Sequence, residues 1–116
     1  MKVAIIGSRT LDIEIPEDAV PKNATVILSG GAPGIDRRAR DYAVAHRIRI
    51  LEVLPDYDRF GRSAPLQRNN EIIAKADLVL AFWDGKSRGT KHVIDRCREI
   101  GKPVKVFLQE EIENGE

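Results

Sequence analysis

The chain of 116 residues has little cysteine, few aromatic residues and almost no net charge. Cys97 is the only cysteine, which excludes an internal disulfide and a cysteine-based metal cluster and favours a reducing, intracellular setting. The formal net charge of +1 gives no overall electrostatic reason to expect nucleic acid, although it leaves room for a local basic patch. With 42% hydrophobic and 32% charged residues, the composition is that of one soluble globular domain.

The sequence also lacks long apolar runs and groups of metal ligands. Its longest uninterrupted apolar run, Leu78 to Trp83, is far shorter than the ~20 residues that span a bilayer. A strand pattern begins at once, without the pattern of a signal peptide, so we expect a cytoplasmic protein without a membrane partner. His46 and His92 are distant in sequence and have no cysteine or carboxylate at ligand spacing, so we predict no metal site, and no cofactor either.

What the sequence does contain is an alternation of short apolar runs and amphipathic segments. The apolar runs predict five strands, at 3–6, 25–29, 48–54, 78–83 and 104–108. Helical spacing predicts helices over 34–46, 65–75 and 90–100. Strands that alternate with helices indicate an α/β fold with a mainly parallel sheet of five strands, covered on both faces.

Two segments between these elements show no strand or helix periodicity. In residues 11–21, Pro16 and Pro21 bracket a single predicted helical turn. Residues 55–64 are predicted to form a loop. On the helix that follows, we expect Leu66 to face inward with the isoleucines. Gly101 and Pro103 predict a clean end to the last helix. We assign 1–108 to one domain and expect the acidic tail, 109–116, to fray.

The stretch Ser29-Gly30-Gly31-Ala32-Pro33-Gly34-Ile35-Asp36 is the strongest local signal for a binding site. It follows an apolar run and opens a helical pattern. A strand, a glycine-rich turn and a helix N-terminus together bind anions well, because free backbone N–H groups and the helix dipole point the same way. This stretch therefore predicts a site for the phosphate of a nucleotide-like ligand.

Three other segments should meet this loop at the carboxyl edge of the sheet, where open α/β folds bind ligands. They are Gly7-Ser8-Arg9, the region around Arg68 and Asn69, and a second glycine-containing loop, 84–90. The residues predicted to bind the ligand are Gly7, Ser8, Arg9, Ser29, Gly30, Gly31, Ala32, Gly34, Ile35, Asp36, Arg68, Asn69, Asp84, Gly85, Ser87, Gly89 and Thr90.

Several of these residues allow more than one interpretation. Arg9 and Arg68 carry forked cations that suit phosphate oxygens, but each could be an ordinary surface arginine. Asp36 either stabilises a helix N-terminus or accepts hydrogen bonds from ribose hydroxyls. Thr90 could donate to a phosphate or cap the last helix. The arginines between 37 and 68 form either a solvated face or a shallow track for single-stranded nucleic acid.

Four ordered motifs give the chain a resemblance to a known group. The sequences GSR, SGGAPGID, RNNEI and WDGKSRGT resemble those of the SLOG superfamily over about residues 1–108. This Rossmann-like group contains the Lonely Guy phosphoribohydrolases and the DNA processing protein A family. The resemblance implies a Rossmann-like three-layer sandwich and a nucleotide or ADP-ribose-like ligand. It suggests a sensor or carrier, with nucleotide 5′-monophosphate hydrolysis or single-stranded DNA binding as alternatives, and a homodimer.

The chain departs from the hydrolases of that group at one place. Arg68 of this chain matches an arginine of the hydrolases. The hydrolases also carry a Pro-Gly-Gly-x-Gly-Thr segment followed by paired glutamates. Here Gly89 and Thr90 remain, and no carboxylate follows until Asp95. Cleavage of an N-glycosidic bond benefits from a carboxylate that stabilises positive charge on the ribose and orients water. Asp36 or Glu71 could supply one, so the sequence leaves the presence of an activity open.

Overall fold

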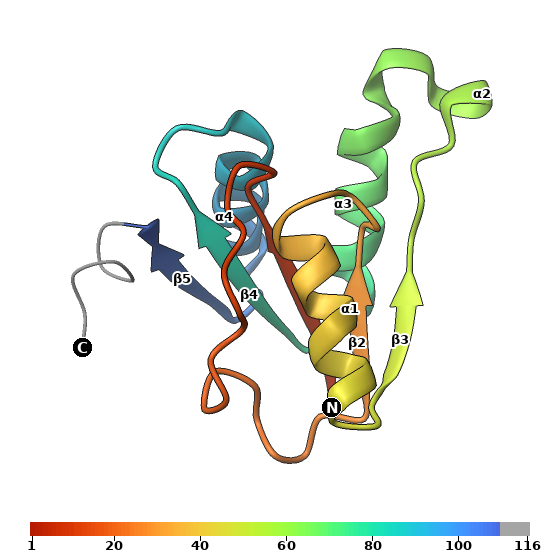
Figure 1. The fold of residues 1–116 in the computed structure, drawn as a ribbon. Helices are drawn as coiled ribbons and strands as arrows, with labels where there is room; N and C mark the ends of the chain where they lie inside the picture. The colour runs from red at the N-terminus through yellow and green to blue at the C-terminus, as the bar shows by residue number, and fades with distance from the viewer. Residues whose placement is uncertain (110–116) are drawn as a thin grey trace.

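A computed structural model describes residues 1–109 of the chain, and the expectation for the acidic tail lies almost wholly outside them. A five-stranded, all-parallel sheet forms the centre, in the spatial order β3-β2-β1-β4-β5 (Figure 1). The strands are β1 (Lys2–Gly7), β2 (Val26–Ser29), β3 (Arg49–Glu52), β4 (Leu78–Trp83) and β5 (Val104–Leu108). The predicted α/β, Rossmann-like fold with five strands is confirmed.

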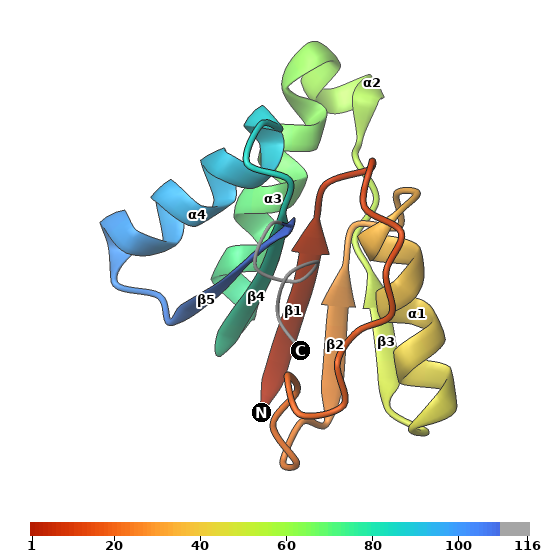
Figure 2. The same cartoon turned by 60° about the vertical axis from the view of Figure 1, so that its left-hand side comes forward.

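Helices cover both faces of the sheet. α1 (Ile35–Ala45) lies on one face, and α3 (Ala64–Lys75) and α4 (Arg88–Ile100) lie on the other, as the two views show (Figures 1 and 2). The three predicted helices are confirmed within one or two residues. Ile35, Ala39 and Ala43 form the buried stripe of α1, as their spacing predicts. Gly101 ends α4 in the left-handed conformation, with φ at 75°.

The core consists of two apolar layers, one on each side of the sheet. Alternate side chains of the central strands point to opposite faces, so Val3 and Ile5 pack towards α1 while Ala4 and Ile6 pack towards α3 and α4. Phe82 of β4 stacks on Phe107 of β5, with ring centroids 4.5 Å apart. Strands buried on both faces read as continuous apolar runs, which is why β1 and β4 were recognisable in the sequence.

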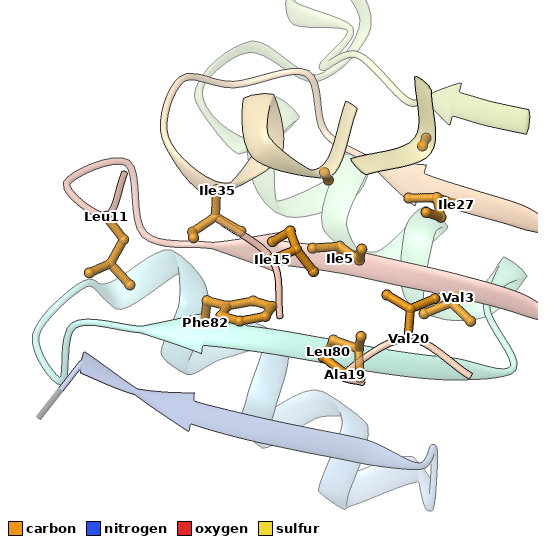
Figure 3. Packing of buried hydrophobic residues seen from close by; sticks show 12 residues of the cluster. Val3, Ile5, Leu11, Ile15, Ala19, Val20, Ile27, Ile35, Leu80 and Phe82 are labelled. Atoms are coloured by element: carbon orange, nitrogen blue, oxygen red, sulfur yellow. The ribbon is translucent and has the colours of Figure 1, made fainter. Parts of the chain in front are cut away.

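The connection from β1 to β2 differs from the prediction. Around Pro16 the chain makes a hydrogen-bonded turn, with the N–H of Ala19 on the carbonyl of Pro16 at 3.0 Å, rather than a helical turn. Leu11 and Ile15 of this segment nevertheless bury their side chains in the same cluster as Phe82 and Ile35, and Val20 lies beside Val3 and Leu80 (Figure 3). An extended segment therefore covers the part of the sheet that α1 leaves open.

Two predictions near residue 60 are wrong. The expected loop at 55–64 contains a short helix, α2 (Tyr57–Phe60), and a 3-10 turn at Gly61–Ser63. Asp56 caps α2 by accepting a hydrogen bond from the N–H of Arg59, which is enough to close one helical turn. Leu66 does not face inward but is 40% exposed, because α3 turns its isoleucines, Ile72 and Ile73, towards the sheet.

Candidate functional site

A cleft opens at the carboxyl edge of the sheet between β1 and β4. These two strands are neighbours, yet the chain leaves β1 towards β2 on one side and leaves β4 towards β5 on the other. Connections that diverge in this way leave a crevice outside the strand ends. The cleft has a volume of about 340 Å³. Its walls come from the loops after β1 and β4, the glycine loop after β2, and the first turns of α3 and α4.

The amino end of α4 forms one wall of the cleft. Ser87 precedes the helix but its side chain caps no backbone N–H group. The first intrahelical bond runs from the N–H of Lys91 to the carbonyl of Ser87, at 3.3 Å. The N–H groups of the first turn, which include those of Gly89 and Thr90, therefore lack intrahelical acceptors. They give this wall a partial positive charge, reinforced by the helix dipole.

Asp84 holds the loop that leads into α4. Its Oδ1 accepts hydrogen bonds from the N–H groups of Lys86 and Ser87, both at 2.8 Å, and its Oδ2 accepts one from the Thr10 hydroxyl at 2.9 Å. The backbone hydrogen bond from Ser87 is the largest cause that holds the pKa of Asp84 well below its usual range. Because the carboxylate is occupied on both oxygens, Asp84 shapes the cleft and ties the β1 loop to the β4 loop.

Three hydroxyl groups meet beneath that wall. The Ser8 hydroxyl lies 2.6 Å from that of Ser87 and 3.4 Å from that of Thr90, and it accepts a hydrogen bond of 3.2 Å from the N–H of Asp84. Ser8 and Thr90 are buried, and all three line the cleft. Hydroxyl groups can reorient to donate to an anion, so this cluster suits phosphate oxygens.

The glycine loop after β2 is held against α3 by Arg68. Its Nη1 donates to the carbonyl oxygen of Gly30 at 2.8 Å, and its Nε donates to Oδ1 of Asn69 at 2.8 Å. A Cβ on Gly30 would lie 2.6 Å from Nη1 of Arg68 and 2.9 Å from Oδ2 of Asp36, so a side chain at this position would have to displace the guanidinium of Arg68. Burial lowers the pKa of Arg68, and the nearby carboxylate of Asp36 opposes that shift.

Asp36 is the least satisfied polar side chain of the site. It is 5% exposed and lies in the first turn of α1, where its Oδ2 accepts a hydrogen bond from the N–H of Ala32 at 3.1 Å. Its Oδ1 is buried and accepts no hydrogen bond from residues 1–109. Burial raises the pKa of Asp36 to about 6, against the opposing effects of the Ala32 N–H and of Arg68 and Arg9.

Comparison with known proteins identifies one relative. The chain is 36% identical over 85 residues to the Gene 61 protein of Mycobacterium phage D29, and the match covers 68% of each chain. The chain belongs to the family of this phage protein. No protein-family model matches the chain, and no solved structure matches it. The resemblance to the SLOG superfamily stays a prediction.

Most of the predicted site residues of this family member lie together in the cleft. The cleft is lined by the predicted residues Gly7, Ser8, Arg9, Ala32, Asp36, Arg68, Asn69, Asp84, Ser87, Gly89 and Thr90. These come from all four of the segments that the sequence predicts at the carboxyl edge. The fold also requires glycine at position 7, since a Cβ there would lie 2.6 Å from the carbonyl oxygen of Phe82.

The other predicted residues do not line the cleft. Ile35 is fully buried in the core, and Ser29 is buried with its hydroxyl accepting from the N–H of Gly31 at 3.3 Å. Gly31 and Gly34 adopt positive φ, at 71° and 80°, and shape the loop. The remaining two, Gly30 and Gly85, also lie outside the lining residues.

Sequence reasoning missed four lining residues, which are Ile6, Thr10, Pro65 and Val93. Val93 lies one helical turn after Gly89, so the i, i+4 spacing could have added it. Thr10 directly follows the predicted Gly7-Ser8-Arg9 segment. Thr90 is not the cap of α4, because the helix begins at Arg88 and places Thr90 in its first turn.

Other residues considered for catalysis or nucleic-acid binding lie away from the cleft. Glu71 is exposed and pairs with Lys75 at 3.1 Å, one turn along α3. Arg37 and Arg40 line a separate, open hollow of about 280 Å³ beside the glycine loop. Within residues 1–109, no His, Cys, Asp and Glu side chains group in a way that could hold a metal ion. No helix in the same range has the length and apolar character to cross a membrane.

Proposed function

We propose that this protein binds a phosphorylated, nucleotide-like ligand in the cleft, with the phosphate at the amino end of α4. The observation that carries the proposal is the convergence of three kinds of donor on one cleft. Backbone N–H groups of the first turn of α4, the hydroxyl groups of Ser8, Ser87 and Thr90, and the guanidinium of Arg9 all belong to the lining of one cleft. Each of these groups stabilises phosphate oxygens.

The size of the cleft also supports a small organic phosphate. Its volume of about 340 Å³ falls at the lower end of the ~300–1,000 Å³ typical of ligand sites. A mononucleotide or a smaller phosphate ester suits such a space. Membership of the SLOG superfamily is part of the same proposal, because the four motifs that carry the resemblance supply the walls of this cleft.

A substitution at Gly89 tests the phosphate position. A Cβ on Gly89 meets nothing within 4 Å, and an aspartate in the first helical turn is favourable for the helix. Gly89→Asp should therefore leave the protein folded while its carboxylate repels a phosphate. Gly89→Asn has nearly the same shape without the charge and serves as the matched control.

The measurement is thermal stabilisation and calorimetric binding with nucleoside monophosphates, ADP-ribose, ribose 5-phosphate and inorganic phosphate. We expect at least one of them to bind the wild type, Gly89→Asp to lose that binding, and Gly89→Asn to keep more of it. Normal binding to Gly89→Asp would show that the phosphate lies elsewhere. A wild type that binds none of the panel would overturn the proposed function.

Hydrolysis of a nucleoside monophosphate is the second candidate, and Asp36 is what favours it. A general base works best with a pKa near the working pH, and Asp36 lies in the cleft with its pKa raised to about 6. Glu71, the other carboxylate considered, does not line the cleft. Incubation with nucleoside monophosphates should then release free base from the wild type and not from Asp36→Asn. No release across the panel would argue against an enzyme.

Two proposals about partners have simpler tests. Binding of single-stranded nucleic acid would use the hollow of Arg37 and Arg40 and would weaken steeply as salt rises. An affinity that does not change with salt would contradict this proposal.

A homodimer would bury two exposed apolar side chains, Leu51 in β3 and Leu54 just after it. Sedimentation at several protein concentrations would detect the dimer. A monomer mass throughout would contradict the dimer.

A further inference from the structure

β3 forms an open edge of the sheet, and exposed apolar side chains lie along it. It is the last strand in the spatial order, so within residues 1–109 no strand pairs with its outer side (Figure 1). Eight large apolar side chains are exposed in this range, and four of them, Leu51, Leu54, Tyr57 and Phe60, lie in β3 or in the segment that follows it. A strand edge with exposed apolar side chains is a template for pairing with another strand.

The opposite edge of the sheet, β5, has a different surface. None of the exposed large apolar side chains lies in β5, whose one exposed residue is Lys105. A lysine on an edge strand is a common protection against pairing with another chain. The difference between the two edges favours β3 as the edge that has a partner.

The backbone of β3 has hydrogen-bonding groups that face away from β2. The N–H of Val53 donates to the carbonyl of Ser29, the last residue of β2, at 2.8 Å. Successive residues of a strand direct their N–H and C=O groups to opposite sides of the strand. Ile50 and Glu52 alternate with the residues that face β2, so their backbone groups point outward and can bond to a further strand.

The charges along β3 favour an antiparallel partner of the same sequence. Arg47 and Arg49 lie at the amino end of the strand. Glu52, Asp56 and Asp58 lie at its carboxyl end or just beyond. Two parallel copies would bring like charges together, whereas two antiparallel copies bring the basic end of each strand to the acidic end of the other. A two-fold axis perpendicular to the sheet produces the antiparallel arrangement.

We propose that two copies of the chain pair through β3 across such an axis and join their sheets into one. This inference rests on the proposed homodimer and assigns its interface. In the register that uses the outward groups, Ile50 of each copy bonds to Glu52 of the other, and the two copies of Leu51 lie opposite each other. Leu54, Tyr57 and Phe60 add the apolar area that a stable dimer needs beyond two short strands.

Sedimentation of the wild type and two variants tests the interface. Leu51→Lys places two like charges at the axis, and the variant should fold because Leu51 is already 39% exposed. Ile100→Lys is the matched control, because Ile100 is 46% exposed and ends α4, which follows β4 and precedes β5. We expect the wild type and Ile100→Lys to form a dimer as concentration rises and Leu51→Lys to stay a monomer.

A cysteine at the axis tests the register. Residues opposite each other in a non-hydrogen-bonded pair have Cα atoms ~4.5 Å apart, within the range that a disulfide spans. Leu51→Cys should therefore give a disulfide-linked dimer on mild oxidation. Arg49→Cys is the control, because the two copies of residue 49 are offset by four residues, about 13 Å along the strands. Cys97 is buried and remains in every variant, so the wild type shows its own contribution.

The outcomes separate the interface from the homodimer itself. A dimer that persists in Leu51→Lys would overturn pairing through β3 and leave a homodimer through another surface. Failure of Leu51→Cys to cross-link, or equal cross-linking through Arg49→Cys, would overturn the register and with it the inference. A wild type that stays monomeric at every concentration would overturn both the inference and the proposed homodimer. Binding of a phosphorylated ligand is measured separately and does not depend on any of these results.

Discussion

Arg68 and Gly30 contact each other across 38 positions of sequence, with Nη1 of the arginine on the glycine carbonyl oxygen at 2.8 Å. A Cβ on residue 30 would lie 2.6 Å from the same nitrogen. The arginine therefore occupies the space that a side chain at position 30 would need. This contact fixes the glycine loop to the first turns of α3, and the cleft depends on both.

Gly30→Ala should displace the guanidinium of Arg68. We expect the free energy of unfolding to fall by about 1–3 kcal/mol, the usual cost of losing a hydrogen bond to a charged group, and ligand binding to weaken with it. Chemical denaturation measures the first effect. In an Arg68→Ala background the same substitution should cost much less, because the group it displaces is gone. An equal cost in both backgrounds would show that position 30 acts independently of Arg68.

Asp36→Asn should stabilise the protein at neutral pH. Burial raises the pKa of Asp36 from 3.8 to about 6, so the folded state keeps its proton to a higher pH than the unfolded state. The free energy of unfolding therefore falls as pH rises from about 4 to about 6, and stays lower above that range. Removing the group should recover up to about 3 kcal/mol at pH 7 and nothing near pH 4. Denaturation curves of both proteins at several pH values between 4 and 8 provide the measurement. A variant less stable than wild type at pH 7 would contradict the prediction.

Asp84 should have the opposite pH dependence. Hydrogen bonds from Ser87, Lys86 and Thr10 hold its pKa well below the usual range. Its contribution to stability is therefore present above the pKa of an unfolded aspartate, about 4, and is lost as pH falls below that value. Asp84→Asn should lower stability at pH 7 and flatten the decline between pH 4 and pH 2. Thr10→Val removes one hydrogen bond to Asp84 and keeps the charge of Asp84. This variant should therefore retain most of the decline in stability between pH 4 and pH 2.

Gly7→Ala should damage the fold rather than the site alone. The new Cβ would lie 2.6 Å from the carbonyl oxygen of Phe82 and 2.7 Å from Cβ of Ile35, and neither atom belongs to a flexible chain end. Overpacking of this kind costs about 1–3 kcal/mol or more. Gly89→Ala is the matched control, because its Cβ would meet nothing within 4 Å. Similar melting temperatures for the two variants would show that β1 and α1 can separate without cost.

Strands and helix ends could be predicted where a pattern of a few neighbouring residues is enough to identify them. Apolar runs located β1 and β4, and Gly101 with Pro103 marked the end of α4. Leu66 was misplaced because α3 has apolar residues on more than one side, and only its packing decides which side is buried. The segment between β1 and β2 has no helical or strand period, yet it buries Leu11 and Ile15. No local pattern reports burial of that kind.

The sequence by itself determined the order of strands and helices and brought glycine, hydroxyl and arginine residues to the carboxyl ends of the strands. These features depend on side-chain periodicity and turn chemistry, which act over a few residues. Only the tertiary structure decided that Asp36 lies buried with one unused oxygen, that Asp84 is fully occupied, and that Gly31 and Gly34 shape the loop without lining the cleft. Burial and hydrogen-bond partners depend on chain segments distant in sequence, such as Arg68 on Gly30, and no local pattern contains them.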